Sequence, residues 1–271
     1  MAKKNTAQLL SQLDKKIKEV KDSKEFKEML TFFSNFHNYS YHNSILIKMQ
    51  KPDATYVAGY RQWQKKFDRN VKKGEEGIAI LAPFTYKKKV NEDEEDEEKT
   101  TVTKTYFKPV YVFDISQTEG PTVPTLDISI ENEYERLLKP LCEYTKKQGI
   151  KLEFKKLSEA HKGYSKGGKI VINSKANQTE KAAVLVHEIA HEFLHDKEKR
   201  VELSKEIKEM EAEAVAFVVM DHYDIDIKSD KYIALYKKSY DLRESLARIS
   251  KLASDIIKFL DEKLIENKKV S

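Results

Sequence analysis

Two histidines four residues apart, His187 and His191, enclose Glu188 in the segment Val-His-Glu-Ile-Ala-His. On a helix, residues at this spacing lie one turn apart on the same face, so both imidazoles can point at one metal ion. A carboxylate beside two such ligands can take a proton from metal-bound water. The spacing therefore predicts a catalytic divalent metal, with zinc preferred and manganese as the alternative, and Glu188 as the general base of a peptidase-like site.

The residues around this motif predict a buried helix. Asn177-Gln-Thr-Glu180 has the form of a capping box, which marks the start of a helix. The segment from Ala182 to His195 is apolar on almost every side. Burying imidazoles beside a carboxylate costs free energy unless something pairs with them, and a metal ion supplies that partner. The alternative is that hydrogen bonds within the core satisfy the histidines.

A catalytic zinc usually has three protein ligands and one position for water, so a third ligand must come from elsewhere in the chain. Residues 206–219 predict a second helix in which acidic residues lead directly into an apolar stretch. Glu211, 20 residues after His191, is the first choice, Glu213 the second and Glu209 the third. For Glu209 and Glu213, a solvated or capping role is the alternative.

Further polar residues could complete the site. His195 extends the histidine series by one more turn, about 6 Å along the helix axis, so we expect it beyond the metal, in contact with a ligand or with the core. Tyr164, His222 and Tyr223 are candidate hydrogen-bond donors to an oxyanion. The sequence does not choose between these three.

The elements that must position these residues follow from the hydrophobic pattern. Helical periodicity covers residues 5–36 and 39–50, and the strand over 106–115 is expected to pair with 77–82 as an antiparallel hairpin. A Pro-punctuated linker is expected near residues 117–130. The chain is therefore predicted to be an α+β protein of two domains, 1–120 and 130–271, the second mainly helical.

The charge of the chain is unevenly distributed. The formal net charge is +5, whereas residues 1–86 carry 16 Lys/Arg against 9 Asp/Glu, a net of +7. This excess permits a nucleic-acid partner without proving one. Residues 91–98 contain seven acids, and we expect a solvated hairpin tip or mobile loop there rather than an acidic binding site.

Composition also limits the class of protein. With 39% apolar and 35% charged residues, the chain is expected to fold as a soluble globular protein. A single cysteine, Cys142, excludes an internal disulfide and fits a reducing cytoplasm, and we expect it to be a buried hydrophobic residue. No apolar run is long enough for a membrane span and no signal peptide is recognisable, so a cytoplasmic protein without a membrane partner is expected.

Two stretches resemble known families. The motif helix and the pattern Glu211-Ala-Glu213-Ala-Val-Ala-Phe217 resemble the zincin metallopeptidase-like domains of the ImmA/IrrE type, in which the first glutamate of the pattern is the ligand. The N-terminal part resembles the N-terminal domain of ArdC-type antirestriction proteins. The segments that carry this second resemblance are Tyr39-Ser-Tyr-His-Asn43, Gln50-Lys-Pro-Asp-Ala-Thr55, Val57-Ala-Gly-Tyr-Arg-Gln-Trp63, Val71-Lys-Lys-Gly-Glu-Glu-Gly77 and Val112-Phe-Asp-Ile-Ser-Gln-Thr-Glu-Gly120.

The resemblances cover most of residues 10–220, in the order of the ArdC architecture. Asp68-Arg-Asn70 departs from the glycine-arginine pair that is usual in that family, and the acidic segment 91–98 is an addition. The resemblance implies an N-terminal α+β nucleic-acid-binding domain that binds single-stranded DNA, followed by a zincin-like metallopeptidase domain.

The candidate DNA contacts combine aromatic and basic side chains, which stack on bases and neutralise phosphates. They are Tyr41, Asn43, Arg61, Trp63, Arg69, Lys72 and Lys73. Without the resemblance, Trp63 and Phe67 at four-residue spacing are better explained as core residues, and the lysines as a solvated face.

Three functions remain open from the sequence. The first is a metalloprotease that cleaves an unidentified protein substrate, with DNA binding localising or gating the cleavage. The second is a DNA-protecting protein whose metal is mainly structural, and the third is a regulator that cleaves one repressor. The presence of Glu188 argues against a purely structural metal, which needs no base at its open position.

Overall fold

The computed structural model describes residues 5–19, 23–90, 100–123, 134–158, 161–195, 203–227 and 242–268. The chain divides into two compact units, each built from two stretches of sequence. Unit 1 consists of residues 1–16 and 45–123, and unit 2 consists of residues 17–44 and 124–271. Helices α1 (Thr6–Glu19) and α3 (Tyr41–Gln50) each contribute residues to both units.

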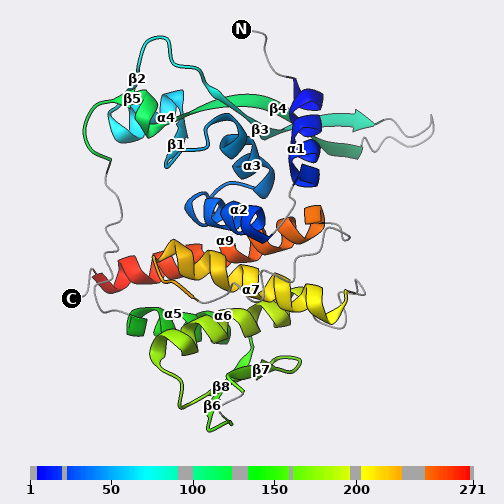
Figure 1. Cartoon of the computed structure of the whole chain (residues 1–271). Coiled ribbons are helices and arrows are strands. Elements are labelled where there is room, and N and C mark those ends of the chain that lie inside the picture. Colours follow the sequence, from blue (N-terminus) through cyan, green and yellow to red (C-terminus); the bar gives the residue numbers. More distant parts are fainter. Residues whose placement is uncertain are drawn as a thin grey trace. The chain divides into compact units, whose positions relative to one another are not determined.

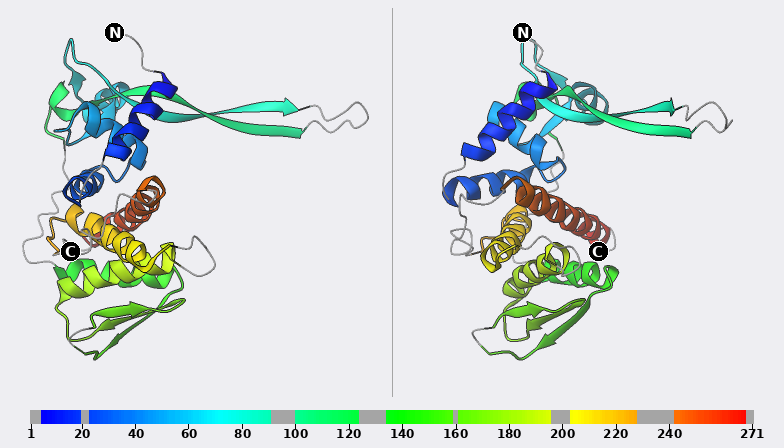
Figure 2. Two further views of the ribbon diagram at one scale, coloured as in Figure 1. Left: turned by 45° about the vertical axis from the view of Figure 1, so that its right-hand side comes forward. Right: turned by 90° about the vertical axis from the view of Figure 1, so that its right-hand side faces the viewer.

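Unit 1 is built around an antiparallel sheet in the order β1 (Val57–Gly59), β4 (Thr100–Asp114), β3 (Ile78–Val90). The expected hairpin is confirmed but is much longer than predicted, because pairing continues from Ile78 opposite Val112 to Val90 opposite Thr100. Figure 2 shows β3 and β4 as a long twisted ribbon. Unit 1 also contains α4 (Tyr60–Phe67), the short 3-10 helix η1 (Ile115–Gln117), and the short strand pair β2 (Asn70–Val71) and β5 (Thr118–Glu119).

Buried polar side chains fix the loops of unit 1. The Asp114 carboxylate accepts hydrogen bonds from the backbone N–H groups of Thr55, Tyr56 and Ser116. Burial raises the pKa of this carboxyl group, but these hydrogen bonds outweigh burial and lower it below its usual value. The Arg69 guanidinium, 9% exposed, donates to Thr118 Oγ1 at 2.8 Å and to the carbonyl oxygen of Gly120 at 2.7 Å. Arg69, which directly precedes β2, is therefore bonded to β5 through Thr118, whereas Asp114 fixes the loops at residues 55–56 and 116.

Unit 2 consists of helices packed on a small mixed sheet. The sheet order is β6-β8-β7, with β6 parallel and β7 antiparallel to β8. Figure 1 shows the sheet on one side of α5 and α6, with α7 and α9 on the other side. The bounds are α2 (Ser23–Asn35), α5 (Tyr134–Lys147), β6 (Lys151–Lys155), β7 (Gly163–Ser165), β8 (Lys169–Asn173), α6 (Gln178–Leu194), α7 (Lys205–His222) and α9 (Leu242–Lys268).

The division into units differs from the continuous ranges 1–120 and 130–271, because residues 17–44 lie with the C-terminal elements. Helix α2 packs on α7 through an amphipathic face whose apolar side chains, such as Phe26 and Leu30, are fully buried. Ser34 Oγ donates a hydrogen bond to Asp221 Oδ2 at 2.6 Å, across the same helix pair. The order of segments in the sequence does not reveal that residues 17–44, which lie between the two stretches of unit 1, pack with unit 2.

Two expectations fall wholly or partly outside the described residues. The acidic segment 91–98 lies there, and so do residues 124–130 of the expected linker. The first residues of that linker are ordered parts of unit 1, since Thr118 and Glu119 form β5. Within the described ranges, no helix is both long enough and apolar enough to cross a membrane.

Candidate metal centre

Helix α6 begins where the sequence predicts. Asn177 Oδ1 accepts a hydrogen bond from the backbone N–H of Glu180 at 2.8 Å, and Glu180 Oε2 accepts one from the backbone N–H of Asn177 at 3.4 Å. This reciprocal pair is the capping box expected at this position. The side chains of Leu185, Val186 and Ile189 are fully buried, so α6 is anchored by its apolar faces.

The imidazoles of His187 and His191 point at a common position, which Glu209 on α7 also faces. The two Nε2 atoms are 3.0 Å apart, and Glu209 Oε2 lies 3.5 Å from His187 Nε2 and 3.7 Å from His191 Nε2. Three ligand atoms this close together can bind one ion. Two imidazole nitrogens and one carboxylate oxygen form a donor set that catalytic zinc sites use, with room for a water molecule.

Glu188 lies next to this cluster in a cavity of about 640 Å³. The lining also includes both motif histidines, Glu209, Tyr164 and Ser165. Glu188 is only 7% exposed, and burial raises the pKa of its carboxyl group despite the opposing effect of the two histidines. A general base works best when its pKa approaches the operating pH, so this direction suits the role predicted for Glu188.

A second carboxylate orients the first histidine. His187 Nδ1 lies 3.1 Å from Glu213 Oε2, which leaves Nε2 directed at the cluster. Burial lowers the pKa of His187, but Glu209 and Glu213 outweigh it and raise the pKa to about 9. The carboxylates around His187 therefore favour positive charge at this point. A carboxylate on the far nitrogen of a metal-binding histidine is a common supporting contact in metal sites.

Glu211, the first choice from the sequence, does not join the two histidines. Its side chain is fully buried and accepts hydrogen bonds from Ser245 and from the Arg248 guanidinium, whose Nη2 is 2.5 Å from Glu211 Oε1. The expected ranking is therefore corrected to Glu209 at the cluster and Glu213 behind His187. The reason is helix geometry, since residues two apart on α7 point about 200° away from each other.

His195 lies one turn beyond the cluster. Its Nδ1 is 3.0 Å from His191 Nδ1, and its Nε2 is 3.1 Å from Glu211 Oε2. Of the three candidate oxyanion donors, only Tyr164 lines the cavity. Tyr223 instead donates to Asp261 Oδ1 at 2.9 Å, and His222 faces the same aspartate.

The edge strand β7 brings Tyr164 and Ser165 to the cavity. A Cβ atom at Gly163 would lie 2.7 Å from Val184 Cγ1, so only glycine allows β7 to pack this closely on α6. The backbone N–H of Gly168 donates to Glu192 Oε2 at 2.6 Å and ties the following turn to the same helix. Sequence reasoning missed Ser165, for which the glycines of this turn were the available signal.

The candidate DNA contacts separate into buried and exposed residues. Trp63 is fully buried and its indole N–H donates to the carbonyl oxygen of Phe113 at 2.9 Å, so it cannot stack on a base. Arg69 is buried in the contacts described above, and Tyr41 is 7% exposed. The structure therefore corrects these three expectations to core roles. Asn43 is half-buried, and three basic residues are exposed, namely Arg61, Lys72 and Lys73.

The β3–β4 hairpin carries an aromatic face that sequence reasoning missed. Phe84 pairs with Tyr106 and Tyr86 with Lys104, so their side chains share one face of the ribbon. Phe84, Tyr86 and Tyr106 are 40%, 48% and 38% exposed. The alternation of aromatic residues in Phe84-Thr-Tyr86 indicates that two rings share one face of β3. The register that places Tyr106 of β4 on the same face is not visible in the sequence.

Two family models match the chain, one in each half. Residues 1–113 match the N-terminal domain of anti-restriction factor ArdC, and residues 145–243 match the IrrE N-terminal-like domain. The ArdC-like match precedes the IrrE-like match along the chain, in the order that the sequence predicts. Both resemblances expected from the sequence are thus confirmed, together with the two-domain α+β architecture.

Individual relatives of this ArdC- and IrrE-like chain are distant. An uncharacterized protein of Bacillus anthracis is 28% identical over 279 residues, which cover 85% of this chain and 47% of that protein. The chain thus spans about half the length of this relative. The metal-free crystal structure of the antirestriction protein ArdC from the R388 plasmid is 19% identical with a TM-score of 0.47, covering 83% of this chain and 85% of that one. For its Mn(II)-bound structure, the identity is 19%, the TM-score 0.45 and the coverage 82% and 83%.

Proposed function

We propose that the IrrE-like domain is a metal-dependent peptidase that binds a divalent ion, zinc by preference, through His187, His191 and Glu209. The observation that carries this proposal is the convergence of the three ligand atoms beside the buried Glu188, at a cavity of about 640 Å³. A site that only stabilised the fold would not require a carboxylate with a raised pKa beside a cavity of this size. We keep manganese as the alternative ion.

The residues of the cavity divide the work of peptide hydrolysis. A divalent ion held there would polarise a carbonyl group and lower the pKa of a water molecule. The Glu188 carboxylate would accept the proton of that water and pass it to the leaving amine. The Tyr164 hydroxyl lines the same cavity and is the candidate donor to the developing oxyanion.

Glu209→Gln is expected to weaken zinc binding by at least about a hundredfold and to abolish hydrolysis. Loss of a residue that merely orients a ligand costs about 10- to 100-fold in affinity, so loss of a ligand should reach the upper end or beyond. The affinity is measured by calorimetric titration with zinc. The binding event that is absent from the His191→Gln variant identifies this site in the titration. Hydrolysis is followed with a library of internally quenched peptides.

Glu206→Gln on the exposed side of α7 is the matched control for charge and helix, and it should bind zinc as the wild type does. Glu211→Gln is the informative comparison. If Glu211→Gln loses zinc while Glu209→Gln retains it, the third ligand is Glu211, as the family pattern implies, and our assignment is wrong.

We also propose that the ArdC-type domain binds single-stranded DNA and that the chain acts as an antirestriction protein. The supporting observation is the aromatic face of the hairpin, where the Tyr106 ring lies 6.0 Å from Phe84 and 5.7 Å from Tyr86. Lys108 Nζ lies 5.0 Å from the centroid of the Tyr106 ring. Exposed rings that alternate with lysines are the combination that stacks bases and neutralises phosphates.

Tyr106→Ala is expected to weaken binding of a labelled single-stranded oligonucleotide by about 5- to 150-fold, because stacking contributes about 1–3 kcal/mol per base. Fluorescence anisotropy at several salt concentrations measures the effect. Phe107→Ala is the matched control, since this neighbour is 53% exposed but points to the opposite face of the ribbon. Equal losses in both variants would remove the hairpin face from the proposal.

Combining the two domains, we propose that DNA binding brings the peptidase to its protein substrate. The competing function is a protein that protects DNA and uses its metal for stability. It predicts oligonucleotide binding without any metal-dependent hydrolysis, so the peptide-library assay separates the two functions.

A further inference from the structure

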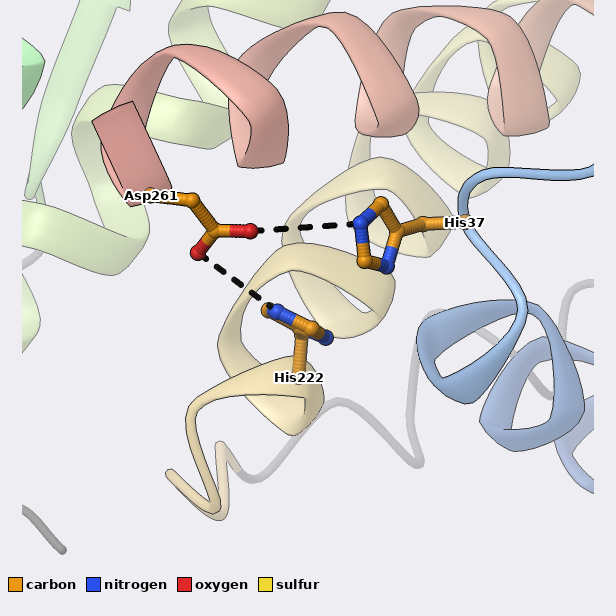
Figure 3. A group of neighbouring side chains, drawn as sticks. All are labelled: His37, His222 and Asp261. Carbon is orange, nitrogen blue, oxygen red and sulfur yellow. Dashed lines mark ion pairs between the residues drawn. The ribbon is translucent and has the colours of Figure 1, made fainter. Parts of the chain in front are cut away.

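A second group of metal-ligand side chains lies in unit 2, formed by three segments that are far apart in the sequence. His37 follows α2, His222 is the last residue of α7, and Asp261 lies in α9. Figure 3 shows both imidazoles facing the carboxylate of Asp261 from two sides. His37 Nε2 is 3.9 Å from Asp261 Oδ2, and His222 Nε2 is 3.7 Å from Asp261 Oδ1.

Backbone contacts assign the protons of both rings. His222 Nδ1 lies 2.9 Å and His37 Nδ1 lies 3.4 Å from the carbonyl oxygen of Ser34. Because a carbonyl oxygen only accepts hydrogen bonds, each Nδ1 carries the proton in the neutral ring. Each Nε2 then presents a lone pair to the Asp261 carboxylate, which also has only lone pairs. A cation between them would remove the repulsion between the lone pairs of the two Nε2 atoms and those of the carboxylate.

That cation is not a proton shared in a hydrogen bond. The separations between the nitrogen and oxygen atoms, 3.9 Å for His37 and 3.7 Å for His222, are both longer than hydrogen bonds. The space between the three groups therefore fits an ion better than it fits a direct hydrogen bond.

We propose that His37, His222 and Asp261 bind a divalent transition-metal ion, zinc by the nature of its ligands, at a site separate from the His187–His191–Glu209 cluster. The three ligand atoms lie within 4.8 Å of one another. In a tetrahedral zinc site with bonds of about 2.1 Å, neighbouring ligand atoms are about 3.4 Å apart, so small side-chain rotations complete the site.

The surroundings support a built site. The Tyr223 hydroxyl donates to Asp261 Oδ1 at 2.9 Å and so orients the carboxylate, as supporting hydrogen bonds do in metal centres. The side chains of His222 and Asp261 are 18% and 17% exposed, which gives an ion and a fourth ligand from water a path to the site. The bound ion would connect the segment after α2 to α7 and α9, so it would stabilise unit 2.

The test uses the full chain with the first site removed by the double substitution His187→Gln/His191→Gln. Titrated with zinc chloride alone, this variant should still bind one equivalent, and the wild type should bind two. Adding Asp261→Asn should abolish the remaining binding and the rise in melting temperature that zinc produces. Asp255→Asn on the same helix is the matched control and should retain both.

Two results would overturn the proposal. One is a wild type that binds a single equivalent, lost in the double variant. The other is equal zinc binding by the Asp261→Asn and Asp255→Asn variants, each made in the double variant.

Circular dichroism shows whether the Asp261→Asn variant folds. If it does not, X-ray absorption of the zinc-loaded double variant tests the proposal instead. The site requires two imidazole ligands, so their absence from the spectrum excludes it. Because the His187→Gln/His191→Gln variant lacks the first site, the result does not depend on peptidase activity.

Discussion

Glu188→Gln should lower the rate of metal-dependent peptide hydrolysis by about 10²- to 10⁴-fold while leaving zinc binding at the first site unchanged. The substitution keeps the shape of the side chain but removes its ability to accept a proton. Glu188 is 7% exposed and burial raises the pKa of its carboxyl group, which suits a group that accepts a proton inside the cavity. Both the rate and the zinc stoichiometry should be measured on the same preparation.

The exposed Glu143 on α5 supplies the control for this experiment, because Glu143→Gln removes one carboxylate that does not line the cavity. Its hydrolysis rate should equal that of the wild type. A Glu188→Gln protein that loses zinc would instead show that Glu188 holds the site together. A variant that keeps both zinc and full activity would remove Glu188 from the mechanism.

The motif helix was predictable because its signals are local. The capping box at Asn177 and Glu180, the apolar periodicity and the four-residue histidine spacing all lie within one segment. The glutamate that faces the two histidines was not predictable in the same way. Helix α7 is apolar on nearly every side after Met210, so its rotation depends on packing against α2, α6 and α9. The sequence does not specify this rotation, which decides whether Glu209 or Glu211 faces the two histidines.

The proposed DNA contacts were harder to predict because the same residue types, aromatic and basic, occur in cores and in sites that stack bases. Trp63 and Arg69 satisfy the aromatic-and-basic pattern, yet both are buried, and their side chains donate hydrogen bonds to Phe113 and Thr118, about 50 residues away in the sequence. The aromatic face of the hairpin depends on the pairing of Phe84 with Tyr106, a non-local register. The second group of metal-ligand side chains was harder still to predict, since His222 lies 185 positions after His37.

Arg248→Met is expected to lower the free energy of unfolding by about 3–5 kcal/mol, because it leaves the fully buried Glu211 carboxylate without its cation. Hydrogen bonds from His195, Arg248 and Ser245 outweigh the effect of burial and hold the pKa of Glu211 below its usual value, so this carboxylate is charged in the folded protein. Urea denaturation followed by circular dichroism measures the change. Glu244→Gln is the control, since it removes only the exposed partner of Arg248 and should cost less than about 0.5 kcal/mol.

The same experiment decides what Glu211 does. If its role is the ion pair, Arg248→Met destabilises the fold while zinc still binds at His187 and His191, and Glu211→Leu/Arg248→Met is less destabilised than Arg248→Met alone because no charge is left buried. If Glu211 is the ligand, zinc itself neutralises the carboxylate. Saturating zinc would then restore most of the stability lost in Arg248→Met, and Glu211→Leu/Arg248→Met would no longer bind zinc at the first site.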